Sequence, residues 1–366
     1  MSRFRKVLYA LLVFALVFGL AEGALRLGGF RYLRVTTDME FNYPRPGFIK
    51  AFFEIDPDLL YRIRPTVKQR YVSLTWQPLF ELKIRDARTF GPKTAGTTRI
   101  LTLGDSSTYG VNTPRPWPLR LQETLDRDAG PGRFEVLNLG VPGYTAFQGR
   151  RLLETRGERL DPDVVIIYFG WNDHLLALGR EDAAQQVGSS GVVSVRNTLV
   201  RSRVYQGMSW LAAALRSGGT RTPLLMDEAG EPLRRVGTTA FQQELRRMIE
   251  LTRSLGATPV LCTYPTAFQV LADMNIEPPP WLTDTHVGPG ASLADALEVQ
   301  ARYNDLVRAT GSDLQVPVVD LAAVFAGGDL RRLFDAPDGD LIHPDDEGYD
   351  LATAQIYQAL RGLAKP

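Results

Sequence analysis

Along residues 99–363, short apolar runs alternate with longer stretches in which apolar residues recur at helical spacing. The run Val164–Phe169 is apolar or aromatic throughout, which is typical of a strand buried on both faces of a sheet. Alternating strands and helices favour a parallel sheet covered on both faces, so we expect a three-layer α/β/α fold. The expected strands lie near Arg99–Leu103, Phe134–Asn138, Val164–Phe169, Pro259–Thr263 and Val318–Leu321, and the expected helices cover Trp117–Arg127, Phe147–Leu160, Phe241–Leu255, Leu293–Arg308 and Gly348–Leu363.

Small polar groups come after three of these expected strands. Gly104-Asp105-Ser106 follows the first, Pro142-Gly143-Tyr144-Thr145 comes after the second, and Gly170-Trp171-Asn172-Asp173 follows the third. Open parallel sheets build their sites at the carboxyl ends of strands. We therefore expect these segments at one edge of the sheet, although Gly-Asp-Ser alone is also a common turn sequence.

The chain has only three histidines, and His343 shares the short segment Asp340-Leu341-Ile342-His343-Pro344 with an aspartate. Serine is a poor nucleophile at neutral pH unless a histidine takes its proton, and a carboxylate fixes the tautomer and steadies the charge of that histidine. An aspartate three residues before a histidine can reach the ring nitrogen that faces away from the serine. Together with Ser106, this segment suggests a serine hydrolase.

The motifs around Ser106, Gly143, Asn172 and His343 resemble those of the SGNH hydrolases, the Gly-Asp-Ser-Leu type esterase superfamily, and its membrane-linked bacterial-type members in particular. The resemblance covers roughly residues 96–366. It implies that Ser106 is the nucleophile, that His343 is the general base, and that Asp340 orients His343. It also implies five strands with a flavodoxin-like winding. Ser107 stands where the name-giving motif commonly has Leu, a change that touches no catalytic atom.

The same resemblance implies an oxyanion hole formed by Ser106, Gly143 and Asn172. A tetrahedral oxyanion needs donors that are fixed in place before its charge develops. The backbone N–H groups of Ser106 and Gly143 and the side-chain amide of Asn172 would supply three. Glycine suits the second position because a side chain there would stand in the way of the substrate.

Tyr109, Trp171 and His174 lie near these motifs and are candidates for substrate binding. For Tyr109 and Trp171, and also for Trp281, packing in the core is an equally good interpretation, because large aromatic residues dominate core contacts. His286 has no motif around it.

The acidic residues near the motifs have structural interpretations. Asp173 is expected to cap a helix rather than to catalyse. Asp345, Asp346 and Glu347 follow Pro344 and are expected in the first turn of a helix. We therefore expect neither a metal site nor a cofactor.

Two stretches do not fit the minimal alternation, and both are expected to form cap-like insertions. The first, residues 174–239, contains a basic cluster from Arg196 to Arg203 and an apolar patch at Met208-Ser209-Trp210-Leu211. The second, residues 264–292, contains Pro278-Pro279-Pro280-Trp281, which forbids a regular helix. Long loops in compact domains are often functional lids, so substrate choice is expected to reside here.

The N-terminus indicates an export signal or a membrane anchor, because three basic residues precede the apolar stretch Val7–Ala21. We expect residues 1–30 to be an uncleaved anchor, which by its flanking charges places the hydrolase outside the cytoplasm. Gly19-Leu20-Ala21 also fits a cleavage site, so secretion after cleavage stays open. Residues 31–95 are expected to form an extension packed on the catalytic domain, residues 96–366.

Composition sets bounds on partners. The 42 basic and 41 acidic residues nearly balance, which gives no reason to expect a nucleic-acid partner. The single cysteine, Cys262, excludes an intrachain disulfide and is expected to be a buried thiol, since it lies in an expected strand. Neither observation sets the oligomeric state.

The expected activity is hydrolysis of an ester outside the cytoplasm. By analogy with membrane-linked SGNH proteins, the favoured substrate is an O-acylated glycan, with deacetylation as the reaction. A lipase-like esterase acting on a longer acyl chain stays open. So do an acyltransferase that moves an acyl group onto a glycan with the same residues, and a non-catalytic glycan-binding or assembly factor.

Overall fold

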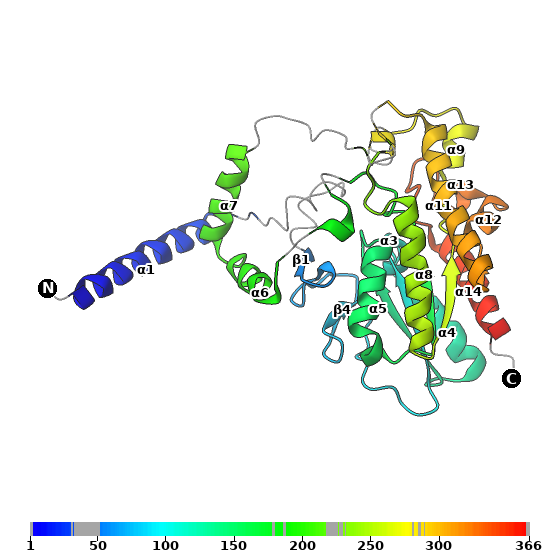
Figure 1. Cartoon of the computed structure of the whole chain (residues 1–366), viewed down its shortest axis with the longest axis horizontal. Coiled ribbons are helices and arrows are strands. Elements are labelled where there is room, and N and C mark those ends of the chain that lie inside the picture. The colour runs from blue at the N-terminus through cyan, green and yellow to red at the C-terminus, as the bar shows by residue number, and fades with distance from the viewer. Residues whose placement is uncertain are drawn as a thin grey trace. The chain divides into compact units, whose positions relative to one another are not determined.

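The computed structural model describes residues 3–30, 32, 52–177, 180–185, 188–216, 226, 230, 232–279, 282–284, 287–288 and 290–363. The chain divides into two compact units (Figure 1). Unit 1 comprises Met1–Pro57 and Gln186–Pro223, and unit 2 comprises Asp58–Gln185 and Leu224–Pro366. The first expected insertion is thereby divided, because its central part, Gln186–Pro223, belongs to unit 1.

Unit 2 is built on a five-stranded parallel sheet in the order β6-β5-β7-β8-β9. This strand order confirms the expected flavodoxin-like winding. In register, Gly104 is level with Gly140 on one side and with Tyr168 on the other, so the carboxyl ends of three strands meet at one edge. The strands are β5 (Thr98–Gly104), β6 (Phe134–Gly140), β7 (Val164–Tyr168), β8 (Thr258–Cys262) and β9 (Val318–Val319).

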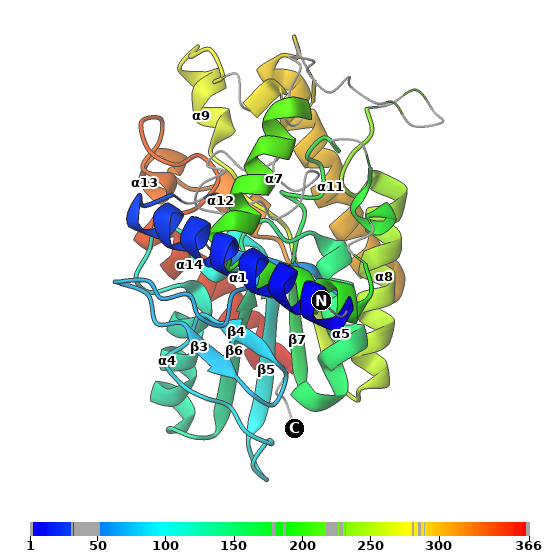
Figure 2. The same ribbon diagram turned by 90° about the vertical axis from the view of Figure 1, so that its left-hand side faces the viewer.

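Helices cover both faces of this sheet, as expected. Figure 2 shows α4 (Trp117–Ala129) on one side of the strands and α5 (Ala146–Leu160) and α8 (Thr238–Ser254) on the other. The helix α4 packs against α14 (Asp346–Leu363), whereas α8 packs against both α5 and α11 (Leu293–Leu314). Shorter helices are α3 (Ser106–Tyr109), α9 (Phe268–Asp273), α12 (Leu321–Ala326), α13 (Leu330–Phe334) and the 3₁₀ turn Asp182–Ala184.

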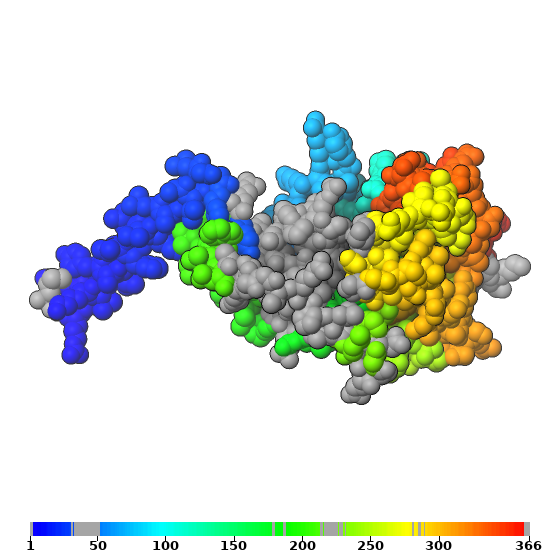
Figure 3. All heavy atoms as spheres, turned by 90° about the horizontal axis from the view of Figure 1, so that it is seen from above, coloured from blue at the N-terminus to red at the C-terminus, as the bar shows by residue number. Residues whose placement is uncertain are grey.

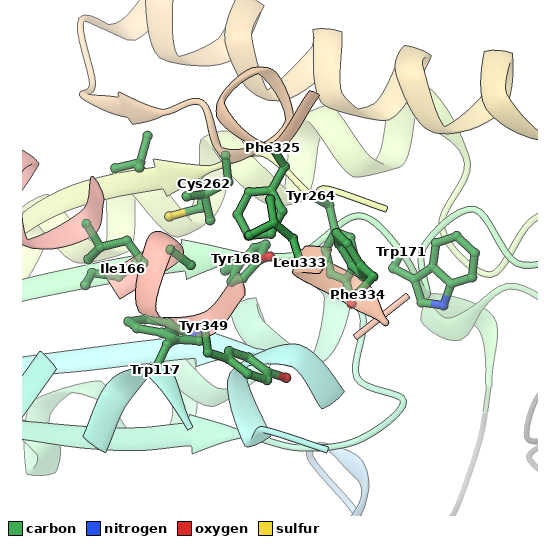
Figure 4. Close-up of a cluster of buried hydrophobic side chains, with 14 of the residues drawn as sticks. Trp117, Ile166, Tyr168, Trp171, Cys262, Tyr264, Phe325, Leu333, Phe334 and Tyr349 are labelled. Carbon is green, nitrogen blue, oxygen red and sulfur yellow. The ribbon is translucent and has the colours of Figure 1, made fainter. Parts of the chain in front are cut away.

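The core beneath α4 and α14 is rich in aromatic side chains (Figure 4). The rings of Trp117 and Tyr168 are 6.4 Å apart between centroids, and those of Tyr168 and Tyr264 are 5.1 Å apart. Cys262 is buried in the same cluster, which confirms the expected buried thiol, and burial raises the pKa of that thiol. This packing holds α14, and the segment that leads into it, against the sheet.

Two glycines allow α3 to lie directly across the strand ends. A Cβ atom at Gly104 would collide with the side chain of Thr108, and one at Gly140 would collide with the backbone of Tyr109. Because neither position has a side chain, α3 begins immediately beyond β5 and packs on β6.

Residues 58–95 pack on the α3 side of unit 2. They contain β2 (Leu60–Ile63) and an antiparallel pair, β3 (Thr75–Gln77) and β4 (Leu82–Ile84). Arg85 is buried and donates to the backbone carbonyl groups of Tyr109 (2.9 Å), Gly110 and Thr113. The N-terminal extension therefore supports the loop that follows α3.

The second expected insertion contains α9, a short helix that the sequence analysis did not predict. Pro278 and Pro279 are outside any helix. Pro280, Trp281 and His286, which the sequence analysis discussed, lie outside the described residues.

Unit 1 contains α1 (Arg3–Leu27), β1 (Phe53–Asp56), α6 (Ser190–Leu199) and α7 (Arg203–Arg216). Of the described helices, α1 alone is long and apolar enough to cross a membrane, by length and composition. It agrees with the expected apolar segment at the N-terminus, and an anchor and a signal peptide both fit such a helix.

Candidate active site

Ser106, His343 and Asp340 form a continuous chain of hydrogen bonds. The Nε2 atom of His343 lies 2.7 Å from Oγ of Ser106, and its Nδ1 atom lies 2.7 Å from Oδ2 of Asp340. Because a carboxylate only accepts, Nδ1 carries the proton toward Asp340 and Nε2 accepts from the serine hydroxyl. These are the distances that proton transfer from a serine to a histidine requires.

Asp340 is held in its ionised form. Burial alone would raise its pKa, but the hydrogen bond and charge of His343, together with the backbone N–H groups of Ile342 (2.9 Å) and His343 (3.1 Å), lower the pKa to about 2. Asn112 donates to the same carboxylate over 2.8 Å. Asp340 is therefore a fixed negative charge beside the imidazole at neutral pH.

The position of Ser106 follows from the turn between β5 and α3. Ser106 is the first residue of α3, and Asp105 caps that helix by accepting from the N–H of Ser107 (2.9 Å). The register places this turn at the edge of the sheet where β6 and β7 also end. The helix cap at Asp105 and the parallel register thus bring Ser106 beside the loops that follow β6 and β7.

Asn172 links the turn that carries Ser106 to the loop that carries Gly143. Its Nδ2 atom donates to Oδ2 of Asp105 (3.0 Å) and to the backbone carbonyl group of Tyr144 (3.1 Å). One contact is next to Ser106 in sequence and the other is next to Gly143. Since an amide nitrogen has two N–H bonds, Asn172 must share or release one of them to donate to an oxyanion.

The backbone carbonyl group of Gly143 is held in place by a buried arginine. Gly143 has a φ of 83°, which lies in the region that favours glycine, and its carbonyl oxygen accepts from Nη1 of Arg235 (2.9 Å). Arg235 forms a buried ion pair with Asp182 (2.8 Å), which also accepts from Oγ1 of Thr145 (2.8 Å). Among the described residues, none accepts a hydrogen bond from the Gly143 N–H.

Asp105 is a buried carboxyl group at the centre of this arrangement. Burial raises its pKa to about 7, against the lowering effect of the Ser107 N–H, the charge of His343 and the hydroxyl of Tyr264. The Tyr264 hydroxyl also lies 2.6 Å from Oγ of Ser107. Asp105 is thus poised between its two protonation states near neutral pH.

The three residues suggested for substrate binding are buried. Tyr109 bonds Gln69 through its hydroxyl (2.8 Å), and its ring lies under the Arg85 guanidinium. The ring centroids of Trp171 and His174 are 4.9 Å apart, and Trp171 belongs to the core cluster. The structure gives all three a packing role, and contact with a substrate stays a prediction.

The acidic residues have the structural positions that were expected, except that Asp345 precedes α14 and accepts from the N–H of Gly348 (2.9 Å) instead of lying in the first turn. Asp173 accepts from the N–H of Ala146, the first residue of α5, and from Gly170, so it caps a helix from a neighbouring loop. Asp346 and Glu347 lie in the first turn of α14. Within the described residues, no group of three or more His, Cys, Asp or Glu side chains is arranged to hold a metal ion.

Sequence reasoning missed the residues that support the site. Asn112 had no signal, because it lies in a loop and touches Asp340 only through tertiary structure. Asp182 and Arg235 lay at opposite ends of an expected insertion, and nothing in their spacing indicates an ion pair. Their burial and their pairing are visible only in the folded chain.

Residues 102–351 match a family model described as the GDSL-like lipase/acylhydrolase family. A lipase/acylhydrolase from Enterococcus faecalis is 19% identical, with a TM-score of 0.45 over 74% of this chain and 98% of that one. A GDSL-like lipase from Bacteroides thetaiotaomicron is 16% identical, with a TM-score of 0.43 over 75% of this chain and 93% of that one. An acetyl xylan esterase is 16% identical, with a TM-score of 0.43 over 72% of this chain and 99% of that one. A search of the curated proteins found no match.

The family model covers well over half of the 366 residues, from within β5 to within α14. The matched region includes Ser106, Gly143, Asn172, Asp340 and His343. On this match, the chain belongs to the GDSL-like lipase/acylhydrolase family.

Proposed function

We propose that this protein is a serine esterase in which Ser106 is the nucleophile, His343 the general base and Asp340 its orienting carboxylate. The observation that carries the proposal is the pair of 2.7 Å contacts that link Ser106 to His343 and His343 to Asp340. Membership of an acylhydrolase family supports the same reaction class.

In the first step, Oγ of Ser106 attacks the acyl carbonyl carbon while its proton passes to Nε2 of His343. The new C–O bond forms as the carbonyl π electrons move onto oxygen. Asp340 stabilises the imidazolium that results. The N–H groups of Ser106 and Gly143 and one N–H bond of Asn172 are proposed to bind the oxyanion.

In the second step, the bond to the leaving alcohol breaks and His343 returns its proton to that oxygen. Water then attacks the acyl-enzyme by the same route, with His343 as base. The products are a carboxylic acid and a free alcohol, and Ser106 recovers its proton.

We propose an O-acyl ester as substrate, with acetyl as the acyl group and a cell-envelope or exported polysaccharide as the alcohol. The apolar α1 supports a location outside the cytoplasm, because it fits either an anchor or an export signal. The acetyl group and the glycan are proposed by analogy with membrane-linked SGNH hydrolases.

The test is release of p-nitrophenol from acetyl and longer-chain esters by the full chain in detergent. Ser106→Ala and His343→Ala are expected to abolish turnover. Ser107→Ala is a matched control, because it removes the adjacent hydroxyl, which contacts Tyr264 rather than His343. The Ser107→Ala variant is expected to keep most of the esterase activity. Its Ser106 is also expected to react with a fluorophosphonate label as in the wild type.

Four outcomes separate the alternatives. Faster turnover of acetyl esters supports a deacetylase, and faster turnover of long chains favours a lipase-like esterase. Labelling of Ser106 without ester hydrolysis would point to acyl transfer. A folded wild-type protein that neither turns over esters nor takes the label would exclude catalysis by Ser106.

A further inference from the structure

Helices α6 and α7 of unit 1 carry large apolar side chains on their surfaces. On α6, Val192, Val195 and Leu199 recur at the spacing of one helix face, and on α7 Met208, Leu211 and Leu215 repeat that spacing. These side chains and that of Trp210 are between 44% and 79% exposed. The opposite side of α6 is packed against the protein. Val193 and Val200 are buried there, and Asn197 donates to the backbone carbonyl group of Ile55 (2.8 Å).

The start of α7 is fixed to the end of α1. The carboxylate of Glu22, in the last turns of α1, accepts from Oγ of Ser202 (2.9 Å) and from the N–H of Val204 (3.0 Å). Arg26 donates to the carbonyl group of Arg201 over 3.1 Å. The Glu22 carboxylate thus occupies the N-terminal end of α7, where helices have unpaired N–H groups.

This junction is also packed closely. A Cβ atom at Gly207 would lie 3.8 Å from Phe30 and 3.9 Å from Leu25. In the space-filling view, atoms of the α6–α7 segment lie against the carboxyl end of α1 (Figure 3). The hydrogen bonds and this contact place α6 and α7 where the apolar helix ends.

The segment is uniformly basic in charge. Residues 188–216 contain four arginines, Arg196, Arg201, Arg203 and Arg216, and no aspartate or glutamate. Apolar faces of Leu, Val and Met beside a purely basic set of charges suit helices that lie in a membrane interface. Such a charge set matches anionic lipid headgroups.

We propose that α6 and α7 lie in the membrane–water interface beside the exit of α1, with their apolar faces toward the acyl chains and their arginines toward anionic headgroups. A bilayer fits better than a second copy, because the start of α7 is bonded to the end of α1, most of whose own apolar side chains are exposed. In the described part of unit 2, by contrast, the exposed large hydrophobic residues are five scattered ones, Tyr71, Leu119, Met226, Met274 and Ile276.

The test is a measurement of membrane depth on the full chain in lipid nanodiscs. Spin labels are attached at Val195→Cys and Leu211→Cys, and at Ser194→Cys as an exposed control off the apolar face of α6. The native Cys262 is buried, so the unmodified protein reports background labelling. We expect collisions with oxygen to exceed those with a water-soluble nickel complex at residues 195 and 211, and the reverse at residue 194.

Each outcome decides the proposal. Water-like accessibility at residues 195 and 211, in variants with wild-type circular dichroism, would overturn it. Shielding from both reagents, with dipolar broadening between labels, would show instead that a second copy covers these faces. Shielding from both reagents without broadening would show burial against the protein itself, and would equally overturn it.

A second comparison tests the charges. Arg196→Gln with Arg201→Gln is expected to reduce the depth of the Leu211→Cys label in phosphatidylglycerol nanodiscs and to leave it unchanged in phosphatidylcholine. The same depth for both proteins in both lipids would contradict the proposed role of the arginines.

Discussion

Asp105 has no exposed surface, and its two carboxyl oxygens hold the serine turn and the asparagine loop together. Oδ1 accepts from the N–H of Ser107, and Oδ2 accepts from the amide of Asn172. One residue therefore couples the position of the proposed nucleophile to that of a proposed oxyanion donor. Its protonation affects both.

The titration of Asp105 leads to a pH-dependent stability. Its pKa rises from 3.8 to about 7 on folding, so its contribution is fully present below the unfolded value and is lost as the pH rises through about 7. We expect the unfolding free energy of the wild type to fall relative to that of Asp105→Asn between about pH 4 and pH 7. Chemical denaturation across this range measures it, and parallel curves for the two proteins would contradict the assignment.

The contribution of Asp340 to stability has the opposite dependence on pH. Its pKa is lowered from 3.8 to about 2 in the folded protein, so its contribution is present above the unfolded value and is lost as the pH falls through about 2. The two carboxyl groups therefore act in different pH windows, so the difference between the wild type and Asp105→Asn from about pH 4 to pH 7 reports Asp105 and not Asp340.

Asn172 is predicted to matter more for turnover than for binding. Removing an oxyanion donor typically lowers kcat by about 10²–10³. We expect Asn172→Ala to lose turnover in that range with little change in KM. Asn112→Ala is a matched comparison, because that amide contacts Asp340 and not the oxyanion position, and its loss should be smaller. Equal losses in steady-state assays of the two variants would argue against the proposed role.

At the scale of elements, the two ends of the first expected insertion support the loop after β6. Arg235 precedes α8 and Asp182 lies in the 3₁₀ turn. Arg235 donates to the Gly143 carbonyl, and its ion-pair partner Asp182 accepts from the Thr145 hydroxyl. The insertion is therefore tied to the site through the backbone that carries a proposed oxyanion donor.

Arg235→Met is expected to reduce both stability and kcat. Breaking a buried ion pair on one side typically costs about 3–5 kcal/mol, because it leaves the partner charge uncompensated. Adding Asp182→Asn removes that charge, so the double variant should recover part of the stability. Its kcat should remain low, since the Gly143 carbonyl still lacks its donor. Recovery of both quantities together would show that Arg235 serves folding alone.

For the whole molecule, the retention of α1 is a separate prediction. The 25 residues of α1 extend about 37 Å, which exceeds the roughly 30 Å hydrocarbon core of a bilayer. We expect the chain to stay with membranes after high-salt and carbonate washes and to be released by detergent. Intact mass spectrometry of the extracted protein should show residues 3–21 still attached. A soluble product that begins near Glu22 would establish cleavage instead.

Much of the fold could be predicted because it is encoded locally. All five strands of the parallel sheet and the five expected helices begin within three residues of their expected positions, although α11 extends six residues further than expected. This agreement arises because apolar periodicity depends on neighbouring residues. Ser106, Asp340 and His343 were also identified from motifs, and the fold brings the three side chains into contact.

The contacts that support the site depend on residues far apart in the chain. Sequence periodicity carries no signal that Arg235 would bond the Gly143 carbonyl, or that Asn112 would reach Asp340. Sequence also does not decide whether Tyr109, Trp171 and His174 line a pocket or pack in the core, because their rings suit both. Their packing is visible only from their burial in the structure. Local sequence thus determined the strands, the main helices and the candidate catalytic motifs, and the strand order followed from the family resemblance. The packing around the site and the association of α7 with α1 depend on residues far apart in the chain, so only the tertiary structure decided them.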